Sequence, residues 1–292
     1  MIEIAEGWRD YVLIDAGGGE KFEMWGRTKV IRPDPQAFWP RTANWDKPDM
    51  HYHRSKSGGG TWEKIGKNVP DAWKINYNGL RFHIRPTGFK HMGLFPEQAV
   101  NWLWLAERIK NAGRPIRVLN LFAYTGGATL ACLNAGAEVT HVDAAKGMNQ
   151  WARDNIALSG LKSPCRVLTD DVYKFVMREG RRGNKYDGII MDPPVFGRGP
   201  GGEMWKLEDG LYDLVTACAG ILTENPLFML INAYTAGFSP TVFGNILNIA
   251  LNKQALVGTV SVGEIGLAAK SGITLPCGMY ARWVSGAGFT PV

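Results

Sequence analysis

Apolar and polar positions follow two different rhythms along this chain. Before about residue 85, short apolar and aromatic stretches alternate with glycine, proline and aspartate, in DYVLIDAGGG, KFEMWG, TKVIRPDPQAFW and WKINYNGLRFHIRP. Aromatic and β-branched residues near a period of two predict short strands, and Asn78-Gly79 is a strong hairpin signal. The glycine-rich stretch SKSGGGTW (55–62) is expected to be a mobile loop, because consecutive glycines are costly to order.

From Pro96 onward the pattern becomes that of alternating helices and strands. Helical spacing of apolar residues predicts a helix over 96–113, followed by strands at 117–124, 138–143, 166–171, 187–192 and 227–234. Helices are expected between and after them at 128–136, 144–160, 172–180, 209–222 and 240–252. This alternation predicts a parallel sheet with helices on both faces. The last two β-rich pieces, 260–268 and 274–284, are close enough to form an antiparallel hairpin.

The change in rhythm also predicts two domains. We expect residues 1–88 to form an N-terminal β-rich domain on the substrate side, and residues 89–292 to form a larger α/β domain. With 45% hydrophobic and 21% charged residues, the composition is that of a folded globular protein and excludes a disordered one.

Charge and cysteine content narrow the setting of the protein. The net charge of +6 and the pI of 9.1 favour a polyanionic partner only weakly, and a solvated surface explains the basic clusters at 27–41 and 178–185 more simply. The four cysteines lack CxxC spacing, which indicates free thiols in a reducing compartment. Without a leader pattern at its start or a long apolar run, the chain is expected to be soluble and cytoplasmic, with no membrane partner.

Ligands of open parallel sheets bind beyond the carboxyl ends of the strands, so the residues there are informative. The first such segment, Ala123–Gly127, has glycines that allow close backbone approach at a helix start. Asp143 ends the second strand and is placed to accept hydrogen bonds from ribose hydroxyls. Asp170 and Asp171 follow the third strand, where Asp171 is the preferred acceptor for an adenine amino group. A structural turn or helix capping could explain each of these residues instead.

The segment Asp192-Pro193-Pro194-Val195-Phe196 is the most specific feature of the sequence. Two prolines make a rigid turn and leave their carbonyls available as acceptors. The Asp192 carboxylate and the Pro193 carbonyl could hold an amino or amide group, while Phe196 stacks on a flat ring. The alternative is a turn that merely terminates the strand.

The order F-x-Y-T-G-G, V-D, D-D-V and D-P-P-x-F resembles class I S-adenosylmethionine-dependent methyltransferases, most closely the bacterial group related to large-subunit ribosomal RNA methyltransferases. The resemblance covers roughly residues 85–285. It implies an α/β, Rossmann-like sheet of seven strands in the order 3-2-1-4-5-7-6, with the last strand antiparallel. The segment 90–98 is similar to a K-x-G-x-F-x-x-Q element of that group, which implies cofactor contacts from Phe95 and Gln98.

The resemblance and the strand-end pattern together define the predicted site. S-adenosylmethionine is the expected cofactor and S-adenosylhomocysteine the product, with no metal. The predicted catalytic residues are Asp192, Pro193, Pro194 and Phe196. The predicted cofactor-binding residues are Phe95, Gln98, Phe122, Ala123, Tyr124, Thr125, Gly126, Gly127, Asp143, Ala144, Asn155, Asp170, Asp171 and Asp192.

A nitrogen of a base in ribosomal or other RNA is the predicted acceptor. Relatives that methylate pyrimidine C5 carry a cysteine nucleophile where this chain has Asn232-Ala233-Tyr234-Thr235, so that chemistry is disfavoured. We expect Arg198, in the glycine-rich loop GRGPGG, to bind the acceptor as the loop closes over it.

Several alternatives stay open at this point. The acceptor could be a protein or a small heterocycle, and the chain could be monomeric or homodimeric. An NAD-dependent oxidoreductase is disfavoured because the loop at Gly126-Gly127 lacks the third glycine of a pyrophosphate fingerprint. A metal hydrolase built on His51 and His53 lacks paired carboxylates at ligand spacing. A non-catalytic nucleic-acid binder fits the N-terminal region better than the whole chain.

Overall fold

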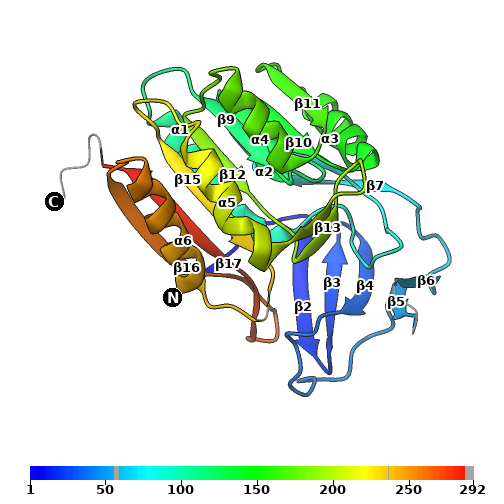
Figure 1. Cartoon of the computed structure of the whole chain (residues 1–292). Helices are drawn as coiled ribbons and strands as arrows, with labels where there is room; N and C mark the ends of the chain where they lie inside the picture. Colours follow the sequence, from blue (N-terminus) through cyan, green and yellow to red (C-terminus); the bar gives the residue numbers. More distant parts are fainter. Residues whose placement is uncertain (56–58, 236, 287–292) are drawn as a thin grey trace. The chain divides into compact units, whose positions relative to one another are not determined.

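The computed structural model describes residues 1–55, 59–235 and 237–286 (Figure 1). These form two compact units. Unit 1 comprises Met1, Asn101–Glu264 and the chain from Gly278 onward, and unit 2 comprises Ile2–Val100 and Ile265–Cys277. The functional division at residues 88 and 89 stays a prediction. Each unit is described by itself below.

Unit 1 is built on a parallel sheet. Its parallel strands are β9 (Arg117–Leu121), β10 (Glu138–Asp143), β11 (Cys165–Thr169), β12 (Gly188–Met191) and β15 (Phe228–Ala233). They are hydrogen-bonded in the order β11, β10, β9, β12, β15. Every residue of β12 and β15 is buried, as expected for central strands that are covered on both faces.

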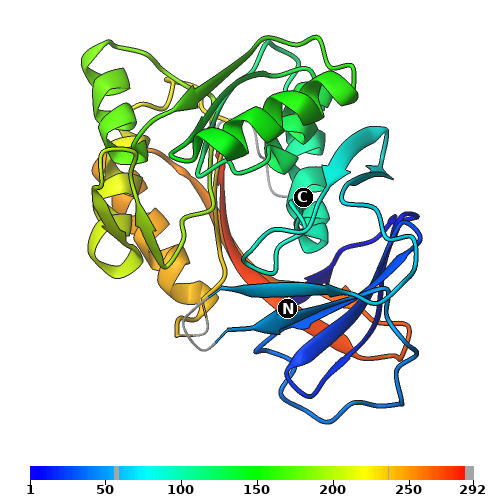
Figure 2. The same cartoon turned by 90° about the vertical axis from the view of Figure 1, so that its right-hand side faces the viewer.

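Helices cover both faces of this sheet (Figure 2). The helices α4 (Val172–Arg181), α5 (Leu207–Ala219) and α6 (Pro240–Lys253) pack on one face and enclose the main hydrophobic core with Leu119, Ile189 and Met229. The helices α1 (Ala99–Lys110), α2 (Gly127–Asn134) and α3 (Lys146–Leu158) lie on the other face. A short 3-10 helix, η1 (Pro96–Gln98), precedes α1.

The two long strands β16 (Gly258–Ala268) and β17 (Thr274–Ser285) form the expected terminal hairpin, and β17 pairs antiparallel with β15. Within the described residues this sheet has one strand more than the seven expected. The eighth is β1 (Ile2–Ile4), which hydrogen-bonds to β16 at the edge of the sheet. An isolated three-residue strand carries too little periodicity to be recognised in the sequence.

Unit 2 is β-rich. The strands β2 (Tyr11–Gly17), β3 (Glu20–Trp25), β4 (Thr28–Pro33), β5 (Met50–Arg54) and β6 (Gly60–Lys64) form a five-stranded sheet in chain order. A separate hairpin joins β7 (Trp73–Tyr77) to β8 (Leu80–Ile84). Its turn is the predicted Asn78-Gly79 pair, and both residues have positive φ as a two-residue hairpin turn requires.

The predicted loop at 55–62 was partly wrong. Gly60, Thr61 and Trp62 belong to β6, where the Trp62 indole N–H donates to the Thr87 carbonyl at 2.8 Å. Residues 56–58 lie outside the described residues. Across the described ranges, none of the helices combines the length and the apolar character that crossing a bilayer requires.

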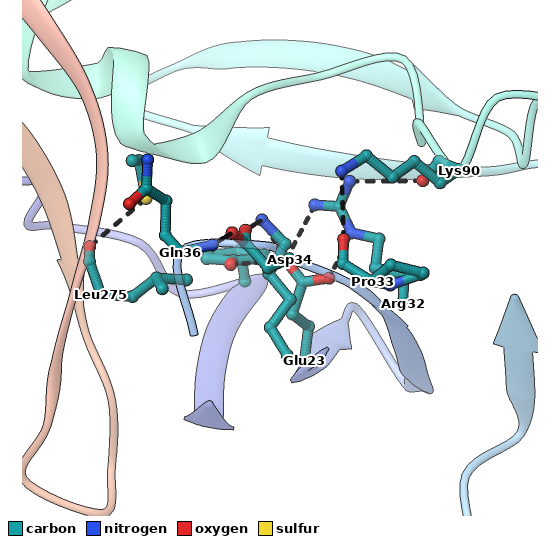
Figure 3. A network of polar contacts seen from close by, with 10 residues as sticks. Glu23, Arg32, Pro33, Asp34, Gln36, Lys90 and Leu275 are labelled. Atoms are coloured by element: carbon teal, nitrogen blue, oxygen red, sulfur yellow. Dashed lines mark hydrogen bonds and ion pairs between the residues drawn. The ribbon is translucent and has the colours of Figure 1, made fainter. Parts of the chain in front are cut away.

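A buried ion network organises unit 2 (Figure 3). The Arg32 guanidinium donates to both carboxylate oxygens of Glu23, at 2.5 and 2.9 Å, and Lys21 lies 3.0 Å from Asp34. Burial alone would raise the pKa of Glu23, but the charge of Arg32 prevails and lowers it to about 2. Lys90 donates to the Pro33 carbonyl at 3.1 Å, and burial together with the nearby Lys21 lowers its pKa to about 8.

Candidate functional site

The loop after β9 has an unusual backbone. Phe122 and Tyr124 have φ values of +53° and +52°, and Gly126 has +90°. Residues other than glycine rarely adopt this left-handed conformation, and when they do they cluster at ligand sites. The loop therefore carries backbone strain at the position where the sequence predicts close approach of a cofactor.

Asp143, at the end of β10, holds this loop. Its Oδ2 accepts from the Tyr124 backbone N–H at 2.9 Å, and its Oδ1 accepts from the Ala145 N–H at 2.8 Å. Burial raises the pKa of Asp143, and the two backbone donors offset part of that rise. Each carboxylate oxygen can accept a second hydrogen bond, so the side chain fits the role of a ribose acceptor. The next residue, Ala144, is half-buried.

A layer of buried polar side chains supports the loop from below. Asn155, predicted as a cofactor contact, is fully buried and donates to the Thr125 carbonyl at 3.0 Å. Asn149 donates to the Asp143 carbonyl at 2.9 Å and to Thr169 Oγ1 at 2.9 Å. Asn155 therefore braces the loop backbone, and Asn149 ties together the ends of β10 and β11.

His141 belongs to the same layer, one strand position before Val142. Its Nδ1 lies 2.9 Å from Thr129 Oγ1, which also accepts from Asn120 at 2.9 Å. Burial lowers the pKa of His141 to about 4, so the imidazole is neutral near pH 7. It therefore serves as a packed hydrogen-bonding group beneath the strand ends.

The paired aspartates after β11 are both engaged. Asp171 is the N-cap of α4, accepting from the Lys174 N–H at 2.8 Å, so the capping interpretation is confirmed. The Asp170 carboxylate forms an ion pair with Arg178. A methyl group added at Gly199 would lie 2.9 Å from Asp171 Oδ2, which puts this aspartate beside the glycine-rich segment.

The turn after β12 leaves distinct acceptors. Asp192 Oδ1 accepts from Asn232 Nδ2 at 3.0 Å. The Pro194 carbonyl already accepts from the Trp205 indole N–H at 2.7 Å, whereas Pro193 is buried. The side chain of Phe196 is 65% exposed. Because the Pro194 carbonyl is engaged by Trp205, the Pro193 carbonyl is the candidate for accepting a hydrogen bond from the molecule to be methylated.

The glycine-rich segment is a β-hairpin, a feature the sequence did not reveal. Strand β13 (Phe196–Arg198) pairs antiparallel with β14 (Met204–Lys206), with Gly197 opposite Trp205. The Trp205 ring also lies 5.2 Å from the ring of Phe122. Glu203 accepts from the Gly201 N–H at 2.9 Å and forms an ion pair with Lys174 of α4. Arg198 is exposed on the hairpin.

Unit 1 thus brings together most of the predicted site. The residues after β9, β10, β11 and β12 meet along one edge of the parallel sheet, and Asp170 N donates to the Asp143 carbonyl at 3.2 Å. Phe95 and Gln98 belong to unit 2, where the Gln98 N–H donates to the Phe95 carbonyl at 3.1 Å. Their contact with a cofactor stays a prediction.

Burial raises the pKa of all four cysteine thiols, which disfavours each of them as a nucleophile. Cys132 and Cys218 are buried in helices and Cys165 begins β11, where burial raises its pKa to about 11. His51 and His53 pair with Glu20 and Glu63 at 2.7 and 2.9 Å. No group of three or more His, Cys, Asp or Glu side chains in the ranges described is arranged to hold a metal.

Sequence reasoning missed residues that act through others. Asn149 carried a usable signal, because it is a polar residue on the buried side of an amphipathic helix. Trp205 carried none, since nothing in the sequence links it to Pro194. Asn101 is likewise remote in sequence from Asn232 in β15, to which it donates at 3.3 Å.

Comparison with known proteins agrees with this geometry. A family model described as S-adenosylmethionine-dependent methyltransferase matches residues 43–204. The crystal structure of a SAM-dependent methyltransferase from Agrobacterium tumefaciens is 37% identical, with a TM-score of 0.92 over 97% of this chain and 93% of that one.

Curated relatives match over a shorter span. Ribosomal RNA large subunit methyltransferase K/L of Pseudoalteromonas atlantica is 32% identical over 50% of this chain and 20% of its own length. Ribosomal RNA large subunit methyltransferase I of Salmonella newport is 30% identical over 55% of this chain and 40% of its own length. The chain thus spans two fifths or less of these two relatives.

Proposed function

We propose that this chain, which belongs to the S-adenosylmethionine-dependent methyltransferase family, methylates a nitrogen of a base in ribosomal or other RNA. The chain is an S-adenosylmethionine-dependent methyltransferase. The oxidoreductase and non-catalytic alternatives are therefore set aside. A protein or a small heterocycle is the competing acceptor.

The proposed cofactor site consists of the left-handed loop 122–126 and Asp143. Backbone groups of Ala123–Gly127 approach the cofactor, and Asp143 accepts from the ribose hydroxyls with its remaining lone pairs. One of the two aspartates Asp170 and Asp171 accepts from the adenine amino group. Phe95, Gln98 and Ala144 complete the proposed contacts. The seven strands from β11 to β16 would correspond to the order 3-2-1-4-5-7-6.

The observation that carries the proposed chemistry is the acceptor pair at the end of β12. Bound S-adenosylmethionine supplies an electrophilic methyl group, and the enzyme has to align the acceptor with it. Asp192 and the Pro193 carbonyl hold the N–H groups of the base and orient its lone pair. Phe196 stacks on the ring, and Arg198 contacts the RNA backbone. The curated relatives act on ribosomal RNA, which supports RNA as the acceptor class.

The test is transfer of a labelled methyl group. Purified protein and S-adenosylmethionine labelled in the methyl group are incubated with ribosomal RNA from cells that lack this gene, and the RNA is digested to nucleosides. We expect label on one base nitrogen and its loss with Asp192→Ala. Label on a carbon or a ribose oxygen, or transfer to protein in a cell extract but never to RNA, would overturn the proposal.

A further inference from the structure

A line of hydrogen bonds crosses the interior of unit 1 and ends at Asp192. Arg282 of β17 donates to Asn101 Oδ1 from Nε at 3.2 Å and from a terminal nitrogen at 2.8 Å. Asn101 of α1 donates to Asn232 Oδ1 at 3.3 Å, and Asn232 of β15 donates to Asp192 Oδ1 at 3.0 Å. We call these four residues the Arg282 relay.

The relay is buried and anchored. Arg282, Asn101 and Asn232 are 4%, 1% and 2% exposed. The guanidinium carbon of Arg282 lies 3.8 Å from the centre of the Tyr280 ring, and Trp104 lies on α1 at 5.1 Å. Stacked between neighbours and held by two bonds to one oxygen, the guanidinium has little freedom to turn.

The direction of every hydrogen bond in the relay follows from its first member. A guanidinium carries donors and no acceptor, so Asn101 must present its oxygen to Arg282. The amide nitrogen of Asn101 then faces Asn232, which must present its own oxygen in return. The nitrogen of Asn232 is thereby directed at Asp192, and the orientations of both amides follow from the guanidinium of Arg282.

We propose that Arg282, Asn101 and Asn232 are positioning residues that hold the Asp192 side chain as a hydrogen-bond acceptor, so that the methyl acceptor must present an N–H donor to it. This inference rests on the proposed function and narrows it. The exocyclic amino group of adenine, cytosine or guanine offers such an N–H donor on the nitrogen that would be methylated. A ring nitrogen without a proton, such as purine N7, could form no hydrogen bond with the Asp192 carboxylate, because both groups are acceptors.

The decisive variant reverses the relay without touching Asp192. In Asn101→Asp one carboxylate oxygen still accepts from Arg282, and the other faces Asn232 where the wild type has N–H. The Asn232 amide then turns its nitrogen toward residue 101 and its oxygen toward Asp192. We expect kcat to fall about 30-fold, as for loss of a hydrogen bond to a charged group, with KM changed much less.

Two further variants separate positioning from packing. Asn101→Leu removes the same amide but imposes no reversed direction, so its loss of kcat should be smaller although its loss of thermal stability is larger. Asn232→Asp places an acceptor directly against Asp192 and should resemble Asn101→Asp in kcat. Equal kcat in Asn101→Asp and wild type, or losses of kcat that simply follow the losses of stability, would overturn the proposal.

A readout without any methyl acceptor distinguishes this inference from the proposed function. In the S-adenosylhomocysteine-bound protein, the side-chain amide resonance of Asn232 is assigned by NMR and compared before and after Asp192→Ala. The resonance should move in the wild-type background and stay in place in the Asn101→Asp background. A resonance that ignores Asp192→Ala in both backgrounds refutes the relay, whereas a normal relay with no methylated RNA refutes only the choice of acceptor.

Discussion

At the scale of single residues, Asp143 combines two tasks that oppose each other. Its carboxylate accepts from the Tyr124 N–H, which fixes the loop after β9, and from the Ala145 N–H just before α3. Burial disfavours its ionised form and raises its pKa, while the ligand that it is proposed to bind favours that form. The carboxylate proposed to bind the cofactor is therefore one whose ionised form is disfavoured by burial.

Asp143→Ala tests that role directly. We expect the dissociation constant for S-adenosylhomocysteine, measured by calorimetric titration, to rise about 30- to 100-fold, because hydrogen bonds to a charged group are lost. Asp154→Ala is the matched control, since Asp154 is exposed on α3 and accepts only from Gln150 among the contacts described here. Unchanged affinity in Asp143→Ala would remove this residue from the cofactor site.

The lowered pKa of Lys90 predicts that the free energy of unfolding depends on pH. Its pKa is lowered from 10.5 to about 8, so between these values the unfolded chain binds more protons than the folded one and folding gains stability as pH rises. Below pH 8 the half-buried ammonium group of Lys90 is charged and lowers the free energy of unfolding. Lys90→Met should therefore unfold at higher urea than the wild type at pH 7, and this difference should shrink toward pH 10.5. A difference that is constant with pH would contradict the assignment.

At the scale of elements, the start of α2 is packed too closely for any side chain. A methyl group at Gly127 would lie 2.6 Å from the Trp102 ring. Gly127→Ala should cost about 1–3 kcal/mol of unfolding free energy and weaken S-adenosylhomocysteine binding as the helix shifts. Gly147→Ala in α3 meets nothing within 4 Å and should instead stabilise by about 0.5–1 kcal/mol. Thermal unfolding of both variants checks the contrast.

The β13–β14 hairpin depends on one tryptophan. Trp205→Phe keeps an aromatic ring beside Phe122 but removes the donor to the Pro194 carbonyl. We expect faster amide hydrogen exchange over 196–206 and a lower kcat, with a stability loss of about 1 kcal/mol. Trp62→Phe removes an equivalent indole bond, to Thr87, and should leave exchange in the hairpin unchanged. If both variants exchange alike in the hairpin, Trp205 is not what orders it.

The elements of unit 1 were predictable because their pattern is local. Short apolar runs indicate β9, β10, β12 and β15, a period of 3.6 indicates the helices beside them, and Asp171 was correctly considered as a helix cap. The hairpin at 196–206 was not predictable, because strands of three residues show no period. Neither was the Arg282 relay, since Asn101 lies 131 residues from Asn232 and 181 from Arg282.

At the scale of the whole molecule, unit 2 is assembled from both ends of the chain. Residues 265–277 return to the N-terminal strands, where Ser271 Oγ donates to Asp15 Oδ1 at 2.7 Å and the Lys270 N–H donates to the Leu13 carbonyl at 3.0 Å. The Ala5 N–H donates to the Gly266 carbonyl at 3.0 Å. Unit 2 therefore contains residues from both sides of the boundary predicted at 88 and 89, which as a functional division stays a prediction.

Truncation tests this assembly. A fragment of residues 89–292 should be insoluble or should lose cooperative thermal unfolding. In it β16 would lose its outer partner β1, and Lys270 and Ser271 would lose their hydrogen bonds to residues 13–15, which leaves an unpaired strand edge. Size-exclusion chromatography and circular dichroism against the full chain give the comparison. A monomeric fragment with a sharp unfolding transition would show that these contacts are dispensable.

Because unit 2 combines two segments that are far apart in the sequence, it cannot be completed early in biosynthesis. Ile2–Val100 leave the ribosome before Ile265–Cys277, and unit 2 is incomplete until this second segment follows. At elongation rates of about 5–20 residues per second, the intervening stretch of about 165 residues corresponds to a wait of roughly 10–30 s. Throughout that interval Ile2–Val100 lack the hydrogen bonds that residues 265–277 make to them, so the nascent chain should be a client of ribosome-associated chaperones.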